Sequence, residues 1–354
     1  MKSLSDIARE LGVSSATVSY VYNGKWRENR IRPVVAARVR RKLEAERAGP
    51  DALGRQLQSG RTLSVGVLLP HLEQAYFLRL LAGIEGRLDE AGYMLFLGIA
   101  HRGRESRQVE LLERMLARRV DAVLMAPRPA SDLRGFLATV RRRSAVPLVF
   151  VDNYMTRLRV ARAVSDNYWG ARETVRRMAA AGRRRILFFG AAPGVAAVED
   201  RYLGYRDAVR EAGLPVLGFK ARGARGVAEP GALRDLLGGS RRPDGVFASS
   251  FLGFLPVLEM MDRLGLRHPD DVLLAGFDEP MESWAQDTVR RVIREPLWAV
   301  IQRADQMGKA AVELALEAIG GADISREVRL IRPDLSWRRS DERRRVRKKE
   351  GRKA

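Results

Sequence analysis

Apolar positions near the start of the chain recur at helical spacing. Ile7, Ala8 and Leu11 fall on one face of a helix that begins in residues 3–6, a run with the Ser-x-x-Asp form of a capping box. Gly12 follows at once, and glycine readily adopts the left-handed conformation that ends many helices. The pattern therefore predicts a short amphipathic helix that stops at a tight turn.

The next forty residues predict two more helices. Residues 15–22 turn Val18 and Val21 to one side, and Ser14 precedes them as an N-cap. The third helix begins near Pro33, and it is expected to bury Val35, Val39 and Leu43 and to expose Arg38, Arg40, Arg41 and Lys42. Two short helices joined across a glycine form a helix-turn-helix. The alternative is a three-helix bundle whose outer face is merely solvated.

Beyond residue 62 the pattern changes to short apolar runs that alternate with amphipathic helices. This alternation is typical of an α/β fold in which helices cover both faces of parallel sheets. Two such units in tandem, at about 63–162 and 163–293, would leave a crevice where their strand ends meet. The predicted strands are 64–69, 94–100, 122–126, 147–151, 186–189, 245–248 and 272–276, and examples of the predicted helices are 77–91, 105–118, 168–181 and 201–212.

Charge favours an anionic partner. The chain has a formal net charge of +21, and its two ends, residues 1–61 and 338–354, each contribute +7. Clustered cations of this kind bind phosphate backbones by releasing counterions. The alternative explanation is a genome that uses arginine codons freely throughout. Residues 340–354 lack apolar periodicity and are predicted to be a disordered basic tail, which either adds DNA affinity or only keeps the protein soluble.

Several classes of site are disfavoured. The sequence has no cysteine and three histidines, so neither disulfides nor a metal site is expected. No apolar run reaches the length of a membrane span, and the N-terminus lacks an export signal, which predicts a cytoplasmic protein with no membrane partner. No glycine-rich phosphate loop or nucleophile elbow is present, so neither an enzyme nor a cofactor is predicted.

Residues 4–24, LSDIARELGVSSATVSYVYNG, resemble the DNA-binding head of the LacI/GalR family. The resemblance implies that the second helix lies in the major groove. Tyr20 occupies a place where many members have arginine, and a phenol cannot make arginine's bidentate contact with guanine. The implied base-reading residues are Ser15, Ala16 and Tyr20, and the other implied DNA-binding residues of the head are Ser5, Thr17, Ser19 and Asn23.

Residues 48–57, AGPDALGRQL, resemble the family's hinge helix. The family usually has Asn and Ala where this chain has Asp51 and Gly54, and glycine lowers helix propensity by about 1 kcal/mol. Leu57 matches an apolar wedge that enters the minor groove, and Arg55 is also carried over as a DNA-binding residue. For a lone leucine the alternative is ordinary packing.

The remaining chain resembles the family's periplasmic-binding-protein-like core, through motifs such as 63–70, 151–153, 201–205 and 275–278. The implied effector-binding residues are Gln74, Tyr76, Phe77, Asp152, Arg201, Phe251 and Asp278. Carboxylates, a guanidinium and aromatic faces suit a small polar ligand. Asp152 and Asp278 could instead cap helices.

Two departures from the family matter. After the strand at 245–248 the chain reads Ser-Ser-Phe where members usually have Asn-Asp, which weakens the expectation of a sugar. The spacing between Pro296 and Gly308 is longer than usual and suggests an extra helical turn.

The combined prediction is a dimeric, effector-responsive repressor that reads a pseudo-palindromic operator in double-stranded DNA. The expected divisions are a head at 1–48, a hinge and linker at 49–62, a sensing and dimerisation core at 63–339 and the tail. The alternatives are a solute-binding receptor with no DNA role, and a regulator with no small-molecule effector.

Overall fold

A computed structural model describes residues 4–22, 24–46, 61–101, 106–129, 133–156, 158–190, 195–219, 230–278, 291–293 and 297–336. The chain divides into two compact units, residues 1–64 and 65–354. The first unit contains the predicted head and the second contains nearly all of the predicted core, so the names head and core are kept for those parts. Each has its own set of buried apolar side chains.

The head contains the three predicted helices, α1 (Leu4–Leu11), α2 (Ser15–Tyr22) and α3 (Pro33–Ala45). Gly12 has a φ of +63°, and the amide of Val13 donates to the carbonyl of Ala8, which closes α1 as the glycine predicted. The amide of Thr17 donates to Oγ of Ser14 at 3.1 Å, so the predicted N-cap is present. The buried side chains are Ile7, Ala8, Val18, Val21, Ala36, Val39 and Leu43, whereas Val35 is only partly buried.

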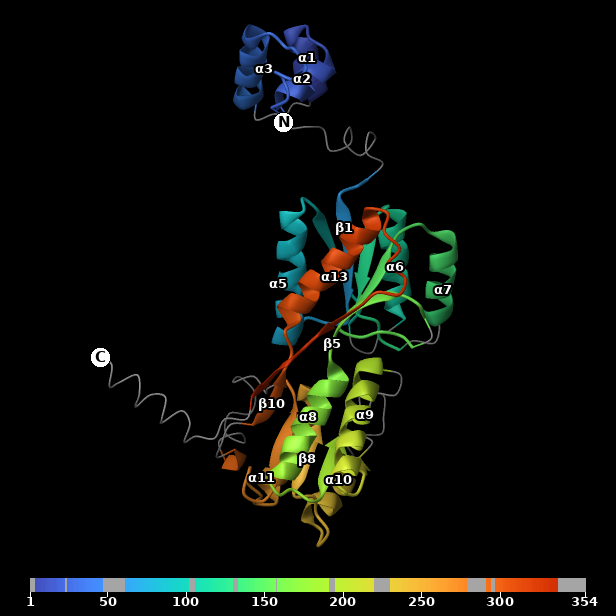
Figure 1. Cartoon of the computed structure of the whole chain (residues 1–354), viewed down its shortest axis with the longest axis vertical. Helices are drawn as coiled ribbons and strands as arrows, with labels where there is room; N and C mark the ends of the chain where they lie inside the picture. The colour runs from blue at the N-terminus through green and yellow to red at the C-terminus, as the bar shows by residue number, and fades with distance from the viewer. Residues whose placement is uncertain are drawn as a thin grey trace, which may run out of the picture. The chain divides into compact units, whose positions relative to one another are not determined.

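The core is built on two sheets (Figure 1), and each has six strands within the described residues. The first has the order β11-β5-β4-β3-β1-β2 and the second the order β12-β10-β9-β8-β6-β7. Strands β1 to β5 and β6 to β10 therefore repeat one doubly wound order, 2-1-3-4-5. The first sheet has β1 (Ser64–Leu69), β2 (Met94–Ile99), β3 (Ala122–Met125), β4 (Leu148–Val151), β5 (Ala161–Ser165) and β11 (Val328–Ile331). The second has β6 (Ile186–Phe189), β7 (Leu217–Phe219), β8 (Gly245–Ala248), β9 (Leu273–Phe277), β10 (Trp298–Ile301) and β12 (Asp334–Ser336).

Helices cover both faces of each sheet. Helices α5 and α13 pack on one face of the first sheet, and α6 and α7 pack on the other. The second sheet lies between α8 and α9 on one side and α10 and α11 on the other. The bounds are α5 (Ala75–Glu90), α6 (Arg107–Ala117), α7 (Leu133–Arg143), α8 (Asn167–Ala180), α9 (Ala196–Glu211), α10 (Pro230–Gly238), α11 (Phe251–Arg263) and α13 (Ala304–Ile319).

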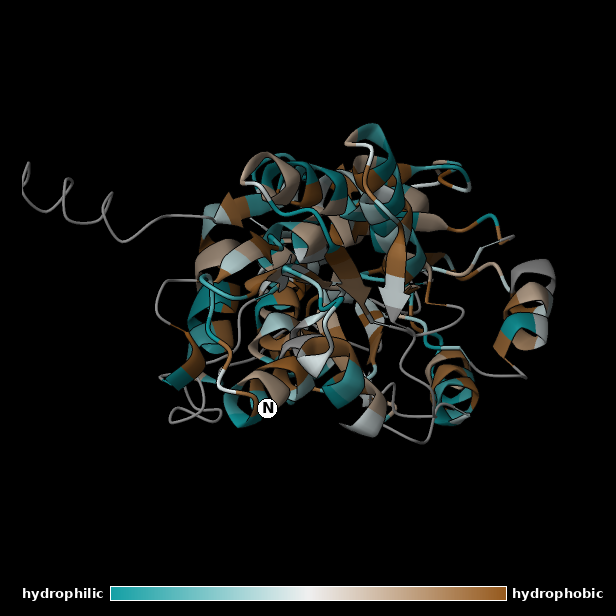
Figure 2. Cartoon of the chain, turned by 90° about the horizontal axis from the view of Figure 1, so that it is seen from below, coloured by the Kyte–Doolittle hydropathy of each residue, from teal (hydrophilic) through white to brown (hydrophobic). Residues whose placement is uncertain are grey.

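Alternating burial explains this arrangement. In Figure 2 the strands are mainly brown, whereas the helices change from brown on one face to teal on the other. In β6, Phe189 contacts the side of α10 and α11, while Phe188 contacts the side of α8 and α9. The predicted fold class, a helical head with two doubly wound α/β halves, is confirmed.

The two halves of the core are interleaved, which the tandem reading did not predict. After β10 the chain returns to the first sheet as α13 and β11, and it then enters the second sheet again as β12, which is antiparallel to β10. The chain therefore passes between the halves after β5, after β10 and after β11. Between Pro296 and Gly308 the described residues form β10 and the first turn of α13, and the expected extra turn or two of helix relative to the family stays a prediction.

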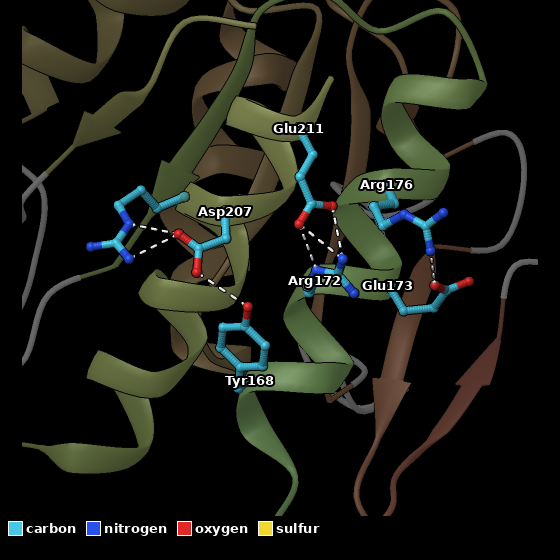
Figure 3. Close-up of polar contacts among 7 residues, drawn as sticks. Tyr168, Arg172, Glu173, Arg176, Asp207 and Glu211 are labelled. Carbon is cyan, nitrogen blue, oxygen red and sulfur yellow. Dashed lines mark hydrogen bonds and ion pairs between the residues drawn. The ribbon is translucent and has the colours of Figure 1, made fainter. Parts of the chain in front are cut away.

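Glycines allow the closest helix contacts. A β-carbon on Gly83 of α5 would overlap the carbonyl oxygen of Asp305 in α13, and one on Gly204 of α9 would overlap that of Tyr168 in α8. Polar side chains join α8 and α9 as well (Figure 3). Tyr168 donates to Asp207 at 3.1 Å, and Arg172 forms a forked contact with Glu211 at 2.8 and 2.9 Å. The α8–α9 pair thus fixes the positions of the polar side chains that it carries.

Candidate functional site

The predicted reading face of the head is open to solvent. Ser15, Ala16 and Tyr20 of α2 are exposed, because Val18 and Val21 on the opposite side are buried against α1 and α3. Ser5 is exposed too, whereas Thr17 and Ser19 are half-buried. Asn23, Arg55, Leu57 and most of the predicted hinge lie outside the described residues.

Polar contacts hold α3 against α1 and keep this face in place. Arg38 donates to the carbonyl of Leu11 at 2.7 Å, and Nζ of Lys42 lies 2.9 Å from the carboxylate of Glu10. Lys42 also donates to Glu46 at 2.8 Å. The hydrogen bonds from Lys42 to Glu46 and Glu10 raise the pKa of Lys42 to about 12.

The core gathers six polar side chains at the carboxyl ends of its strands. In doubly wound folds ligands bind at this edge, beside the point where the strand order reverses. Both halves contribute, since Tyr76 and Asp152 follow strands of the first sheet and Asp278 follows β9 of the second. We call the set the interdomain polar cluster, and its members are Tyr76, Asp152, Asn167, Arg201, Asp278 and Gln302.

Arg201 is the centre of the interdomain polar cluster. Its guanidinium donates to Oδ1 of Asn167 at 2.7 Å, to the carbonyl of Ser249 at 2.6 Å and to Oε1 of Gln302 at 3.3 Å. It also lies 3.7 Å from the ring centroid of Phe277. Burial lowers the pKa of Arg201, and the nearby carboxylates of the cluster oppose that change. Arg201 is therefore fixed in place and remains a cation.

Two aspartates, Asp152 and Asp278, are the acidic members of the cluster. Asp152 accepts from the hydroxyl of Tyr76 at 2.6 Å, and Asp278 accepts from the amide of Gln302 at 3.2 Å. Both aspartates have left-handed backbones, with φ of +67° and +64°. Burial raises the pKa of Asp152, and it raises the pKa of Asp278 to about 6, while Arg201 acts in the opposite direction on both. Burial thus disfavours the charged form of both carboxyl groups, and the nearby Arg201 favours it.

The other predicted effector residues lie in different surroundings. Gln74 is half-buried at the N-cap of α5. Phe77 is buried in the hydrophobic core of the first half and packs edge-on against Tyr76. Phe251 is the first residue of α11, and its side chain lies outside the described part. A direct contact of these three with an effector stays a prediction.

Sequence reasoning missed Asn167 and Gln302. Both are buried, and each accepts a hydrogen bond from Arg201. Nδ2 of Asn167 has no hydrogen-bond partner within the described residues, so the cluster has a donor to spare. The signal for Gln302 was present, because this polar residue directly follows the apolar run 298–301.

A second set of contacts joins the halves beside the cluster. Asn153 accepts from the amide of Ala197 at 3.2 Å, and the hydroxyl of Tyr154 donates to Asp200 at 3.0 Å. The guanidinium of Arg162 lies 4.4 Å from the ring centroid of Tyr154. The two hydrogen bonds connect the end of β4 to the first turns of α9, which also carries Arg201.

The described residues contain neither a candidate metal site nor a candidate membrane span. No group of three acidic or histidine side chains there could hold a metal ion. None of the helices among them is long and apolar enough to cross a membrane.

Comparisons with known proteins agree with this architecture. The family model "Periplasmic binding proteins and sugar binding domain of LacI family" matches residues 62–223, and "Periplasmic binding protein-like domain" matches residues 175–340. The HTH-type transcriptional repressor PurR of Pectobacterium atrosepticum is 28% identical over 353 residues, covering 96% of this chain and 97% of the relative. The ribose operon repressor of Haemophilus influenzae is 26% identical over 343 residues, covering 96% and 98%.

A solved structure shares the fold over nearly the whole chain. The lac repressor dimer bound to operator and the anti-inducer ONPF superposes with a TM-score of 0.78 at 20% identity, covering 96% of this chain and 98% of that one. The two family models together extend from residue 62 to residue 340, and the repressors align across head and core alike. The chain therefore belongs to the LacI/GalR family of transcription regulators.

Proposed function

We propose that this regulator is a repressor that binds a pseudo-palindromic operator as a homodimer and releases it when a small polar effector binds. One observation supports the proposal above all others. A helix-turn-helix head with an exposed second-helix face precedes a two-halved core that contains a buried polar cluster. The relatives named above are themselves repressors, and a dimer bound to operator shares the fold. In this proposal the head, hinge, core and tail are 1–48, 49–62, 63–339 and 340–354, and the protein is cytoplasmic and has no catalytic role.

DNA reading is assigned to the face of α2 that carries Ser15, Ala16 and Tyr20. With its side chains an α-helix is about 10–12 Å across, so α2 fits within a major groove about 12 Å wide. Two heads related by dimer symmetry would read two half-sites. Because Tyr20 has a single hydroxyl, it can offer at most one hydrogen bond to a base edge.

A matched pair of tyrosines tests this assignment. Tyr20 and Tyr22 are both exposed, at 39% and 45%, yet only Tyr20 lies on the predicted reading face. A duplex enriched from a randomised pool by the full-length protein provides the probe, and a scrambled duplex the reference. Tyr20→Ala should reduce the preference for the enriched duplex roughly 10-fold, as loss of one base contact does, while Tyr22→Ala leaves it unchanged. Equal effects of both substitutions, or no enrichment by the parent protein, would count against base reading by α2.

Effector binding is assigned to the interdomain polar cluster. Its two half-buried carboxyl groups can accept hydrogen bonds from ligand hydroxyl or amine groups, and Nδ2 of Asn167 can donate to a ligand oxygen. This chemistry fits a neutral polyhydroxylated or nitrogen-bearing metabolite better than an acid. A thermal-shift screen of sugars, polyols, nucleosides and carboxylates tests it. Stabilisation by carboxylates alone would contradict the assignment, and no stabilisation by any compound would favour a regulator without an effector.

A further inference from the structure

The connection between α2 and α3 has a defined conformation. In residues 24–32, hereafter the basic turn, the amide of Ile31 donates to the carbonyl of Trp26 at 2.9 Å and that of Arg30 donates to Arg27 at 3.1 Å. The amide of Asn29 donates to the carbonyl of Lys25 at 3.2 Å. Trp26 is partly buried against the hydrophobic core of the head. The basic turn is therefore anchored to the folded head.

The basic turn exposes four cations that have no carboxylate partner in the described part of the chain. They are Lys25, Arg27, Arg30 and Arg32, and the turn contains one acidic residue, Glu28. The guanidinium of Arg27 lies 5.0 Å from the ring centroid of Trp26. Lys42 on α3 is different, because Glu10 and Glu46 neutralise it. Uncompensated cations gathered in one ordered turn attract an anion and repel each other until it is bound.

Arg30 adds an independent observation. Its φ is +54°, in the left-handed region that glycine occupies freely and that costs energy for a residue with a β-carbon. Stability alone would favour glycine here. A charged side chain kept at a strained position points to a function that uses the charge.

The location of the basic turn indicates which anion it meets. The turn follows α2 after a single residue, and the amide of Gly24 donates to the carbonyl of Val21 in the last turn of that helix. An 8-residue helix is about 12 Å long, and the major groove is about 12 Å wide. A chain that leaves such a helix inside the groove reaches the groove edge, where the phosphates are.

We propose that the basic turn is a separate, sequence-independent DNA contact in which Arg30 and Arg32 pair with backbone phosphates at the edge of the half-site. This inference rests on the proposed DNA-binding function and adds a binding element to it. Contacts of this kind contribute affinity without base preference. They also make binding salt-dependent, by about 0.9 in the slope of log K against log salt for each phosphate neutralised.

Arg30→Gly gives the sharpest test, because it removes the charge and relieves the strained backbone. In the full-length dimer each substitution removes two contacts, so the log–log salt slope should fall by about 1.8. The loss should be equal on the enriched and the scrambled duplex, and the melting temperature should stay the same or rise. Arg32→Ala should give the same slope change at a residue with an ordinary φ of −59°. Arg176→Ala, which removes an exposed arginine from α8 of the core, is the charge-matched control.

Fluorescence anisotropy between about 50 and 200 mM salt measures these slopes. An unchanged slope for both variants would overturn the proposal, and so would a loss confined to the enriched duplex, which would indicate base reading. If Arg30→Gly lowers the melting temperature, Arg32→Ala alone decides. If the parent protein enriches no duplex, the proposed DNA-binding function is refuted. If the parent enriches a duplex but both variants keep the parent's salt slope, only the role of the basic turn is refuted.

Discussion

Asp278 carries a carboxyl group that ionises reluctantly in the folded protein. Burial is the main cause, and it raises the pKa from 3.8 to about 6 against the opposing charge of Arg201. This shift of about 2 units corresponds to about 3 kcal/mol, since one unit is about 1.4 kcal/mol. The neutral side chain in Asp278→Asn should therefore remove up to about 3 kcal/mol of unfavourable ionisation at neutral pH.

The direction of the pH dependence follows from where the proton is bound. Below pH 3.8 the carboxyl group keeps its proton in both the folded and the unfolded state. Its ionisation therefore does not change the free energy of unfolding there. As the pH rises towards about 6, the unfolded state loses its proton first, and the free energy of unfolding falls. Above about pH 6 the penalty is complete and constant.

Thermal unfolding of parent and variant from about pH 4 to pH 8 measures this difference. At pH 7.5 Asp278→Asn should melt roughly 6 °C higher, at about 2 °C per kcal/mol for a domain of this size, and the two proteins should converge towards pH 4. Asp262→Asn is the control, since its half-buried carboxyl has a pKa lowered by the hydrogen bond from Arg291 and should not reproduce the gain. Parallel curves with a constant offset would refute the reasoning, because they would mean that Asp278 does not titrate in this range.

Two further predictions concern packing within the core. Gly83→Ala should destabilise the core by about 1–3 kcal/mol, because the new methyl group would overlap the backbone of α13. Gly86→Ala on the same helix places its methyl group in open space and should stabilise the core by up to about 1 kcal/mol. Chemical denaturation compares the free energies of unfolding of the two variants. Tyr154→Phe should remove the hydrogen bond to Asp200 between the halves and lower the free energy of unfolding by about 1–3 kcal/mol. Amide exchange at the start of α9 should then become faster. Tyr168→Phe, which removes a bond inside one half, should not change that exchange.

Local signals explain why the head was predictable. The cap at Ser14, the left-handed Gly12 and Pro33 each act within one helical turn, and all three lie where the helices begin or end. Buried parallel strands were predictable for a related reason. Strands β1, β6 and β8 are buried at every position, so each appears in the sequence as a continuous apolar run.

The edge strands β11 and β12 and the chain crossings left no comparable signal. All but one residue of β11 are exposed, so its sequence lacks an apolar run, and β12 has only three residues. The pairing of Ile331 with Ser165 joins segments more than 160 residues apart. An apolar pattern shows that a segment pairs, but not with which sheet. The interleaving of the two halves therefore required the structure.

Only part of the interdomain polar cluster could be predicted from the sequence. Its aspartates and amides lie at equivalent positions after equivalent strands of the two halves. Asp152 and Asp278 each follow the fourth strand of their half, and both have left-handed backbones. Asn167 and Gln302 each follow the fifth strand. The family resemblance identified the carboxylates, whereas the amides look like ordinary residues at the ends of strands. Both amides lie where the chain crosses between the halves, after β5 and after β10, and Arg201 hydrogen-bonds to both, so it connects the two crossing segments to α9.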